Sequence, residues 1–117
     1  MDHRPFVISA QPDGVVAVAG ELDLYTAPEL REQLRATVCG DAERLVVDLR
    51  EVTFMDSSGL AAIFTAWRSA GALDKELVVV ADDDAVRRPL SLAAMDELVP
   101  VLDSEEFALR RVLTARR

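Results

Sequence analysis

Two hydroxyl groups and a carboxylate follow one another in the motif Asp56-Ser57-Ser58-Gly59. The motif opens a predicted helix, where the first backbone N–H groups have no partner within the helix and the helix dipole favours negative charge. The simplest interpretation is a structural cap, which stabilises a helix by about 1 kcal/mol. The same position also suits the addition and removal of a phosphoryl group, because helix N-termini bind phosphate.

The motif lies between a predicted strand and a predicted helix. Residues 45–49 form a short, nearly continuous apolar run, which is typical of a central strand. After the motif, apolar residues recur at helical spacing, namely Leu60, Ile63, Phe64 and Trp67. We expect Phe64 and Trp67 to lie in the core and Gly71 to end the helix.

The whole chain alternates between strands and helices in the order β-β-α-β-α-β-α-β-α. The predicted strands span residues 6–10, 15–19, 45–49, 77–81 and 99–102, and a helix follows every strand but the first. This order predicts an α/β fold with a mixed, largely parallel sheet and helices packed against it. The length of 117 residues suits a single domain, residues 1–117, in which residues 1–5 form a flexible tail.

Three local patterns carry more specific expectations. Thr26 and Glu29 match a capping box at the start of the first helix. Pro89 predicts that the third helix either begins late, near Arg88, or is kinked, because proline lacks an N–H and collides with the preceding turn. Cys39 is expected to be a small apolar filler near the end of the first helix.

Composition excludes several classes of function. The formal net charge is −8, which argues against nucleic acid as a partner and suits a basic protein better, although such charge also serves solubility. His3 is the only histidine, so neither a histidine-based metal site nor a Ser-His-Asp triad is expected within one chain. No apolar run approaches membrane-spanning length. We therefore expect a cytoplasmic, non-enzymatic protein without metal, cofactor or membrane insertion.

Three segments carry a resemblance to a known family. They are Gly20-Glu21-Leu22-Asp23 with Thr26-Ala27, then Asp48 to Val52 with Phe54 to Leu60, and more weakly Leu98 to Val101 with Asp103-Ser104. Together they resemble the STAS domain family, and within it the stand-alone anti-sigma factor antagonists of bacteria. The likeness runs over nearly the whole chain, and Phe-Met-Asp-Ser-Ser-Gly-Leu is its most specific part.

The resemblance implies a regulatory module that binds an anti-sigma factor and so frees a sigma factor for transcription. The anti-sigma factor would itself be a serine kinase with a histidine-kinase-like ATPase fold. The resemblance implies that this kinase phosphorylates Ser57, that phosphorylation releases the complex, and that a phosphatase reverses it. Asp56, Ser58 and Gly59 are expected in the partner interface, and Asp23 near the same surface.

Each of these residues also has a purely structural interpretation. Ser58 fits a role in the helix start better than a role as phosphoacceptor, and Gly59 either allows tight packing or lets a partner approach. Asp23 and Asp56 could be solvated loop carboxylates. The chain also departs from the family pattern, because Ala93-Ala94-Met95 stands where Thr-Gly-Leu is common and Gly71-Ala72 replaces a Gly-Gly pair.

Two other functions are alternatives to that of an anti-sigma factor antagonist. The alternative is a STAS scaffold subunit of a signalling or transport complex that works without phosphorylation, in which Ser57 would only cap the helix. An enzyme is disfavoured, because the chain has no phosphate-cradling G-x-x-x-x-G-K-[ST] loop and no histidine available as a base.

Overall fold

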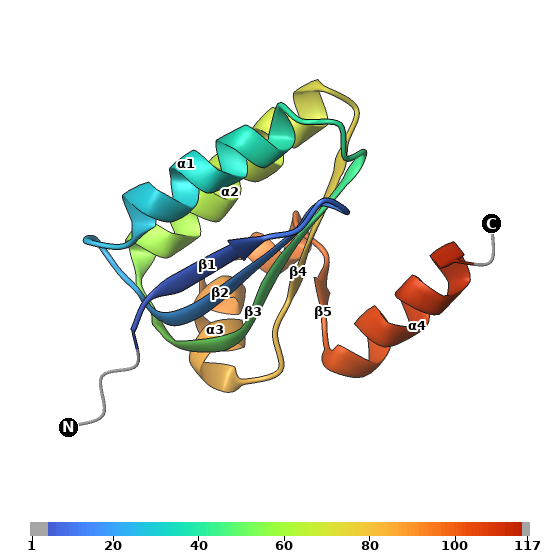
Figure 1. The fold of residues 1–117 in the computed structure, drawn as a ribbon. Helices are drawn as coiled ribbons and strands as arrows, with labels where there is room; N and C mark the ends of the chain where they lie inside the picture. Colours follow the sequence, from blue (N-terminus) through green and yellow to red (C-terminus); the bar gives the residue numbers. More distant parts are fainter. Residues whose placement is uncertain (1–4, 116–117) are drawn as a thin grey trace.

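The computed structural model describes residues 5–115 of the 117, so the predicted tail at 1–5 falls almost entirely outside the described residues. Five strands form one sheet in the spatial order β1-β2-β3-β4-β5 (Figure 1). The strands are β1 Val7–Ala10, β2 Val15–Leu22, β3 Arg44–Met55, β4 Glu76–Val80 and β5 Val101–Leu102. Only β1 is antiparallel to its neighbour, so the predicted mixed, largely parallel sheet is confirmed.

Helices connect the strands in the predicted order. They are α1 Ala27–Val38, α2 Ser57–Ala72, α3 Asp84–Leu92 and α4 Ser104–Ala115, with a 3-10 turn η1 at Met95–Glu97. The element order and the α/β fold class predicted from the sequence are therefore confirmed.

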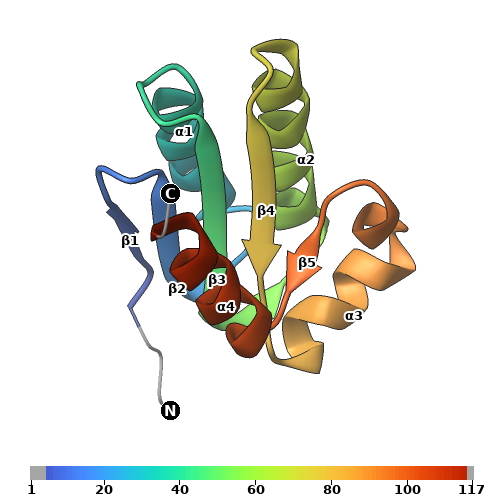
Figure 2. The same cartoon turned by 90° about the vertical axis from the view of Figure 1, so that its right-hand side faces the viewer.

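The sheet has a large core on one face and a small one on the other. Apolar residues of α1, α2 and α3 share one cluster with sheet residues such as Val16, Val47 and Val79. Their neighbours in the strands, Val15, Val46 and Val80, belong to a second cluster with Phe107 of α4. Because successive strand residues point to opposite faces, α4 covers the face that α1 and α2 leave open, as Figure 2 shows.

Strand β3 runs six residues beyond its predicted end at Leu49. Its register against β2 shifts twice, between Ala17 and Ala19 and between Gly20 and Glu21, and each shift adds one residue to β3. Such bulges keep a strand paired while they interrupt its alternation. They leave Leu49, Val52 and Met55 buried at a spacing of three residues.

The ends of α1 differ from expectation. The capping box is wrong, because the hydroxyl of Thr26 makes no capping hydrogen bond and instead donates to the carbonyl oxygen of Glu21, 2.9 Å away. The assignment of Cys39 as an apolar filler is also wrong, since Cys39 is exposed at the C-terminal cap of α1.

The structure also corrects two predicted helix boundaries, the start of α3 and the end of α2. Helix α3 begins at Asp84, capped by the side chain of Asp83, so a late start near Arg88 is wrong and Pro89 lies inside the helix. Helix α2 continues through Gly71 to Ala72, so Gly71 does not end it. Phe64 and Trp67 are partly buried and pack against the main core, as predicted.

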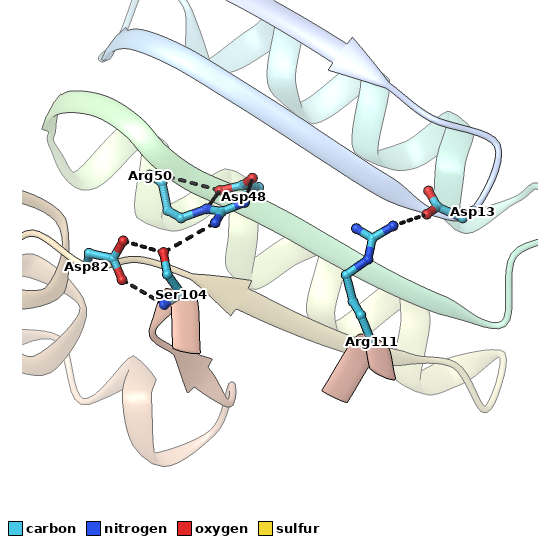
Figure 3. Close-up of polar contacts among 6 residues, drawn as sticks. All are labelled: Asp13, Asp48, Arg50, Asp82, Ser104 and Arg111. Atoms are coloured by element: carbon cyan, nitrogen blue, oxygen red, sulfur yellow. Dashed lines mark hydrogen bonds and ion pairs between the residues drawn. The ribbon is translucent and has the colours of Figure 1, made fainter. Parts of the chain in front are cut away.

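A polar network joins the start of α4 to the sheet (Figure 3). The backbone N–H and the hydroxyl of Ser104 both donate to the carboxylate of Asp82, and Arg50 donates to the Ser104 hydroxyl at 3.2 Å. The hydrogen bond from the Ser104 side chain, followed by that from its backbone, holds the pKa of Asp82 below its ordinary value. Arg50 also pairs with Asp48 on its own strand.

The turn between α3 and η1 contains an alanine in a left-handed backbone conformation. Ala94 has φ 57° and ψ 20°, which costs an L-residue roughly 1–2 kcal/mol. Replacing Ala94 by glycine should therefore raise the free energy of unfolding by about 0.5–1 kcal/mol, once the greater freedom of glycine in the unfolded chain is counted. Urea denaturation measures this difference.

The matched control for that prediction is the neighbouring alanine. Ala93 has φ −88° and gains nothing from glycine, so Ala93→Gly should lower the free energy of unfolding by about 0.5–1 kcal/mol. Equal effects of the two substitutions would contradict the left-handed conformation at Ala94.

The first turn of α2 packs tightly on the sheet at Gly59. A methyl group there would lie 2.7 Å from Cγ of Leu22 and 2.9 Å from Cγ of Met55, and both side chains are buried. Gly59→Ala should lower the free energy of unfolding by about 1–3 kcal/mol through overpacking.

Gly71 provides the control within the same helix. A methyl group at Gly71 meets nothing within 4 Å, so Gly71→Ala should raise the free energy of unfolding by about 0.5–1 kcal/mol. A Gly59→Ala protein as stable as the parent would show that the helix start does not need its close approach to Leu22.

Candidate partner-binding site at the start of helix α2

Asp56, and not Ser57, caps helix α2. Asp56 has an extended backbone, and its carboxylate Oδ1 accepts a hydrogen bond of 2.8 Å from the N–H of Ser58. This satisfies one of the free N–H groups of the first turn. The Ser57 side chain is exposed, and its hydroxyl makes no hydrogen bond with any residue between 5 and 115. The Ser57 hydroxyl is therefore open to the solvent and is not occupied by helix capping.

The strand ends bring two loops together around Ser57. The N–H of Asp56 donates to the carbonyl oxygen of Leu22 at 3.2 Å, which ties the loop after β3 to the end of β2. Gly59 packs on the side chain of Leu22 in the same place. The two connections, β2 to α1 and β3 to α2, consequently lie at the same end of the sheet (Figure 1).

Asp23 organises the loop between β2 and α1. Its Oδ1 accepts hydrogen bonds from the N–H groups of Tyr25 at 2.9 Å and Thr26 at 3.1 Å. The N–H of Asp23 in turn donates to the hydroxyl oxygen of Thr26 at 2.9 Å. The structure thus places Asp23 beside the Ser57 loop but turns one carboxylate oxygen back into its own turn. Contact between Asp23 and a partner stays a prediction.

Ser58 and Gly59 face the protein more than the solvent. Ser58 is half-buried and its N–H is held by Asp56, while Gly59 is buried against Leu22 and Met55. Both residues therefore support the position of the helix. Their direct contact with a partner stays a prediction.

Three exposed apolar side chains near Ser57 escaped the sequence analysis. Leu24 is 67% exposed, Tyr25 is 88% exposed and Phe54 is 48% exposed. Leu24 and Tyr25 project from the turn that Asp23 organises, and Phe54 lies three residues before Ser57. Leu24 and Tyr25 have a signal in the sequence, because they are large apolar residues in a short loop, where polar residues are usual. Phe54 has no such signal, because it lies within strand β3. Leu24, Tyr25, Phe54, Asp56 and Ser57 are called the α2-start surface below.

Two other features, a cluster of metal-binding side chains and a membrane-spanning helix, are not found in the described part of the chain. Between residues 5 and 115, no three His, Cys, Asp or Glu side chains group closely enough to hold a metal ion. None of the helices over the same residues has both the length and the apolar character needed to cross a bilayer.

Comparison with known proteins identifies relatives of the whole fold. An anti-sigma-B factor antagonist of Listeria monocytogenes is 32% identical over 90 residues, which cover 77% of this chain and 79% of that protein. The crystal structure of an anti-sigma factor antagonist from Mycobacterium paratuberculosis matches with 34% identity and a TM-score of 0.78, covering 92% of each chain.

A more distant structure is similar in fold alone. It is the phosphorylated form of the Bacillus cell fate determinant SpoIIAA, with 20% identity and a TM-score of 0.68, covering 92% of this chain and 99% of that one. Residues 7–100 match the family described as "Mlab, STAS domain", and this match includes β1 to β4 and the whole α2-start surface. The resemblance seen in the sequence is thereby confirmed, and the chain belongs to the STAS domain family.

Proposed function

We propose that this protein is an anti-sigma factor antagonist that binds an anti-sigma factor through the α2-start surface and so frees a sigma factor. One observation carries the proposal: Asp56 takes over the capping role, and this leaves the Ser57 hydroxyl exposed at a helix N-terminus beside exposed apolar side chains. The relatives from Listeria and Mycobacterium, which are named as antagonists, support the same function.

Phosphorylation of Ser57 would act as the switch. A phosphoryl group adds about −1.5 to −2 charge near neutral pH. The N-terminus of α2 stabilises negative charge by roughly 0.3–1 kcal/mol, and repulsion from the adjacent Asp56 opposes this gain. The net effect on folding is therefore small, and the fold shared with phosphorylated SpoIIAA is consistent with a domain that remains folded when modified.

Phosphorylation of Ser57 should change the free energy of binding much more than the free energy of folding. In the free protein, water solvates the phosphate at exposed Ser57. In a complex the same charge would lie in the interface, where an unpaired buried charge costs several kcal/mol, and each 1.4 kcal/mol lowers the affinity about tenfold. This difference makes the modification a release signal.

The proposed partner is a serine kinase with a histidine-kinase-like ATPase fold, and a phosphatase would restore the unmodified serine. The net charge of −8 favours a partner with a basic binding surface. In this scheme the protein works in the cytoplasm, where transcription takes place, and the chain itself is a substrate and a ligand and carries out no catalysis.

Charge at Ser57 should control capture of the partner. Wild type and Ser57→Ala should both capture a histidine-kinase-like ATPase from host lysate, and Ser57→Asp should bind the purified ATPase at least about tenfold more weakly. With ATP, this kinase should add one phosphoryl group to wild type and Ser58→Ala but none to Ser57→Ala. Mass spectrometry and calorimetry measure these outcomes.

Ser69→Asp is the matched control for charge. Ser69 is exposed on α2, twelve residues or about 18 Å along the helix from Ser57, so this variant should bind like wild type. Identical binding by the parent and Ser57→Asp would reject the switch and favour the phosphorylation-independent scaffold.

The exposed apolar side chains of the α2-start surface should provide much of the free energy of binding. Tyrosine is enriched among residues whose truncation weakens interfaces most, and Tyr25 is the most exposed large apolar residue in the described chain. Tyr25→Ser should weaken binding of the same kinase by about tenfold or more without lowering the stability of the protein. Leu73→Ser, which removes a 54% exposed side chain from the other end of α2, should leave binding unchanged. Equal losses would place the interface elsewhere.

A further inference from the structure

The side chain of Thr26 joins the two ends of the turn between β2 and α1. Its hydroxyl makes no capping hydrogen bond. The hydroxyl oxygen accepts a hydrogen bond of 2.9 Å from the N–H of Asp23, and the hydroxyl donates to the carbonyl oxygen of Glu21 at 2.9 Å. Both bonds can form at once, because a hydroxyl has one proton and two lone pairs. Thr26 therefore closes a ring that encloses Leu24 and Tyr25.

Both ends of this ring are fixed in the core. Leu22 at the end of β2 is fully buried, and Ala27, directly after Thr26, is 1% exposed. The carbonyl oxygen of Thr26 accepts a hydrogen bond of 3.3 Å from the N–H of Leu30, which is also buried, in the first turn of α1. The Thr26 hydroxyl thus connects a well-packed strand to a well-packed helix.

The two residues between these ends are largely exposed. Leu24 is 67% exposed and Tyr25 is 88% exposed, so burial does little to fix their positions. Hydrogen bonds to the backbone do this instead, because Asp23 Oδ1 accepts from the N–H of Tyr25 at 2.9 Å. The Thr26 hydroxyl oxygen lies 3.2 Å from the same carboxylate oxygen, so it also supports the position of that acceptor.

We propose that Thr26 is a positioning residue of the α2-start surface, whose hydroxyl orders Leu24 and Tyr25 before the partner arrives. Ordering a mobile loop on binding costs free energy, so a turn that is already ordered binds more tightly. Thr26 is half-buried, and the proposal requires no contact between Thr26 and the partner. This inference rests on the proposed function, because it concerns the affinity for the same anti-sigma factor.

The first test measures the order of the turn in the free protein. Thr26→Val keeps the shape of the side chain and removes the hydroxyl. In this variant the backbone amide order parameters of Leu24 and Tyr25 should fall from about 0.85, typical of rigid backbone, towards about 0.6. The order parameter of Ser57 should stay unchanged. Thr26→Ser keeps the hydroxyl and should keep the turn rigid.

The second test measures binding of the purified ATPase that the parent captures from host lysate. Thr26→Val should weaken binding about five- to tenfold, because both apolar side chains must then be ordered on binding. Thr26→Ser should bind like the parent. Thr37→Val is the matched control, since the half-buried Thr37 hydroxyl donates to the carbonyl oxygen of Gln33 at 3.0 Å near the far end of α1. Its loss should leave binding unchanged.

A double-mutant cycle distinguishes positioning from general stabilisation. Thr26→Val should weaken binding less in a Tyr25→Ser protein than in the parent, because one of the side chains that Thr26 positions is already absent. An equal effect in both backgrounds would overturn the proposal. Unchanged order parameters at Leu24 and Tyr25 in folded Thr26→Val would overturn it as well.

Failure of the proposed function gives a different result, because the parent itself then captures no ATPase. Equal binding by the parent and folded Thr26→Val would overturn only the role of Thr26. Circular dichroism establishes that each variant is folded. Thr26→Ala, which also lacks the hydroxyl, takes the place of Thr26→Val in every measurement if the valine variant does not fold.

Discussion

The close approach of α2 to the ends of β2 and β3 is the contact on which the rest of the site depends. Gly59 leaves no side chain between the helix and the buried Leu22 and Met55. The helix axis can therefore start directly above the strand ends, and the hydrogen bond from Asp56 to Leu22 joins the two loops. With Gly59 turned inward and Ser58 half-buried, Ser57 is the residue of the first turn that faces the solvent. The burial of an apolar contact thus determines which serine faces the solvent.

The carboxylates near Ser57 stabilise the two loops through hydrogen bonds to the backbone. Asp56 and Asp23 each use a carboxylate oxygen to hold nearby backbone N–H groups, at Ser58 in one loop and at Tyr25 and Thr26 in the other. Because these acceptors serve the local backbone, the loops remain ordered without help from a ligand. The exposed groups that they present are a hydroxyl and apolar side chains, which suit a protein surface better than a small-molecule pocket.

Local patterns predicted the elements well and their ends poorly. The helix stripe at Leu60, Ile63 and Trp67 and the apolar run at 45–49 were sufficient for the order of the fold. Beyond Leu49, strict alternation would place the charged Glu51 inward, so the pattern predicted an end where bulges in fact carry β3 to Met55. The exposure of Leu24 and Tyr25 was missed, because the outward turn of this loop depends on the hydrogen bonds that Asp23 accepts from the N–H groups of Tyr25 and Thr26. The Ser57 motif could be found because its neighbours follow one another in sequence.

The two bulges in β3 also affect how the length of this chain can vary. Each bulge holds one residue without a counterpart in β2, while Val52 still pairs with Gly20 and Met55 with Leu22. Loss of one residue at either bulge would restore regular pairing and leave these buried side chains on the same face. Insertions and deletions among homologues can therefore fall inside this central strand, close to Ser57, without any change in the loops that flank it.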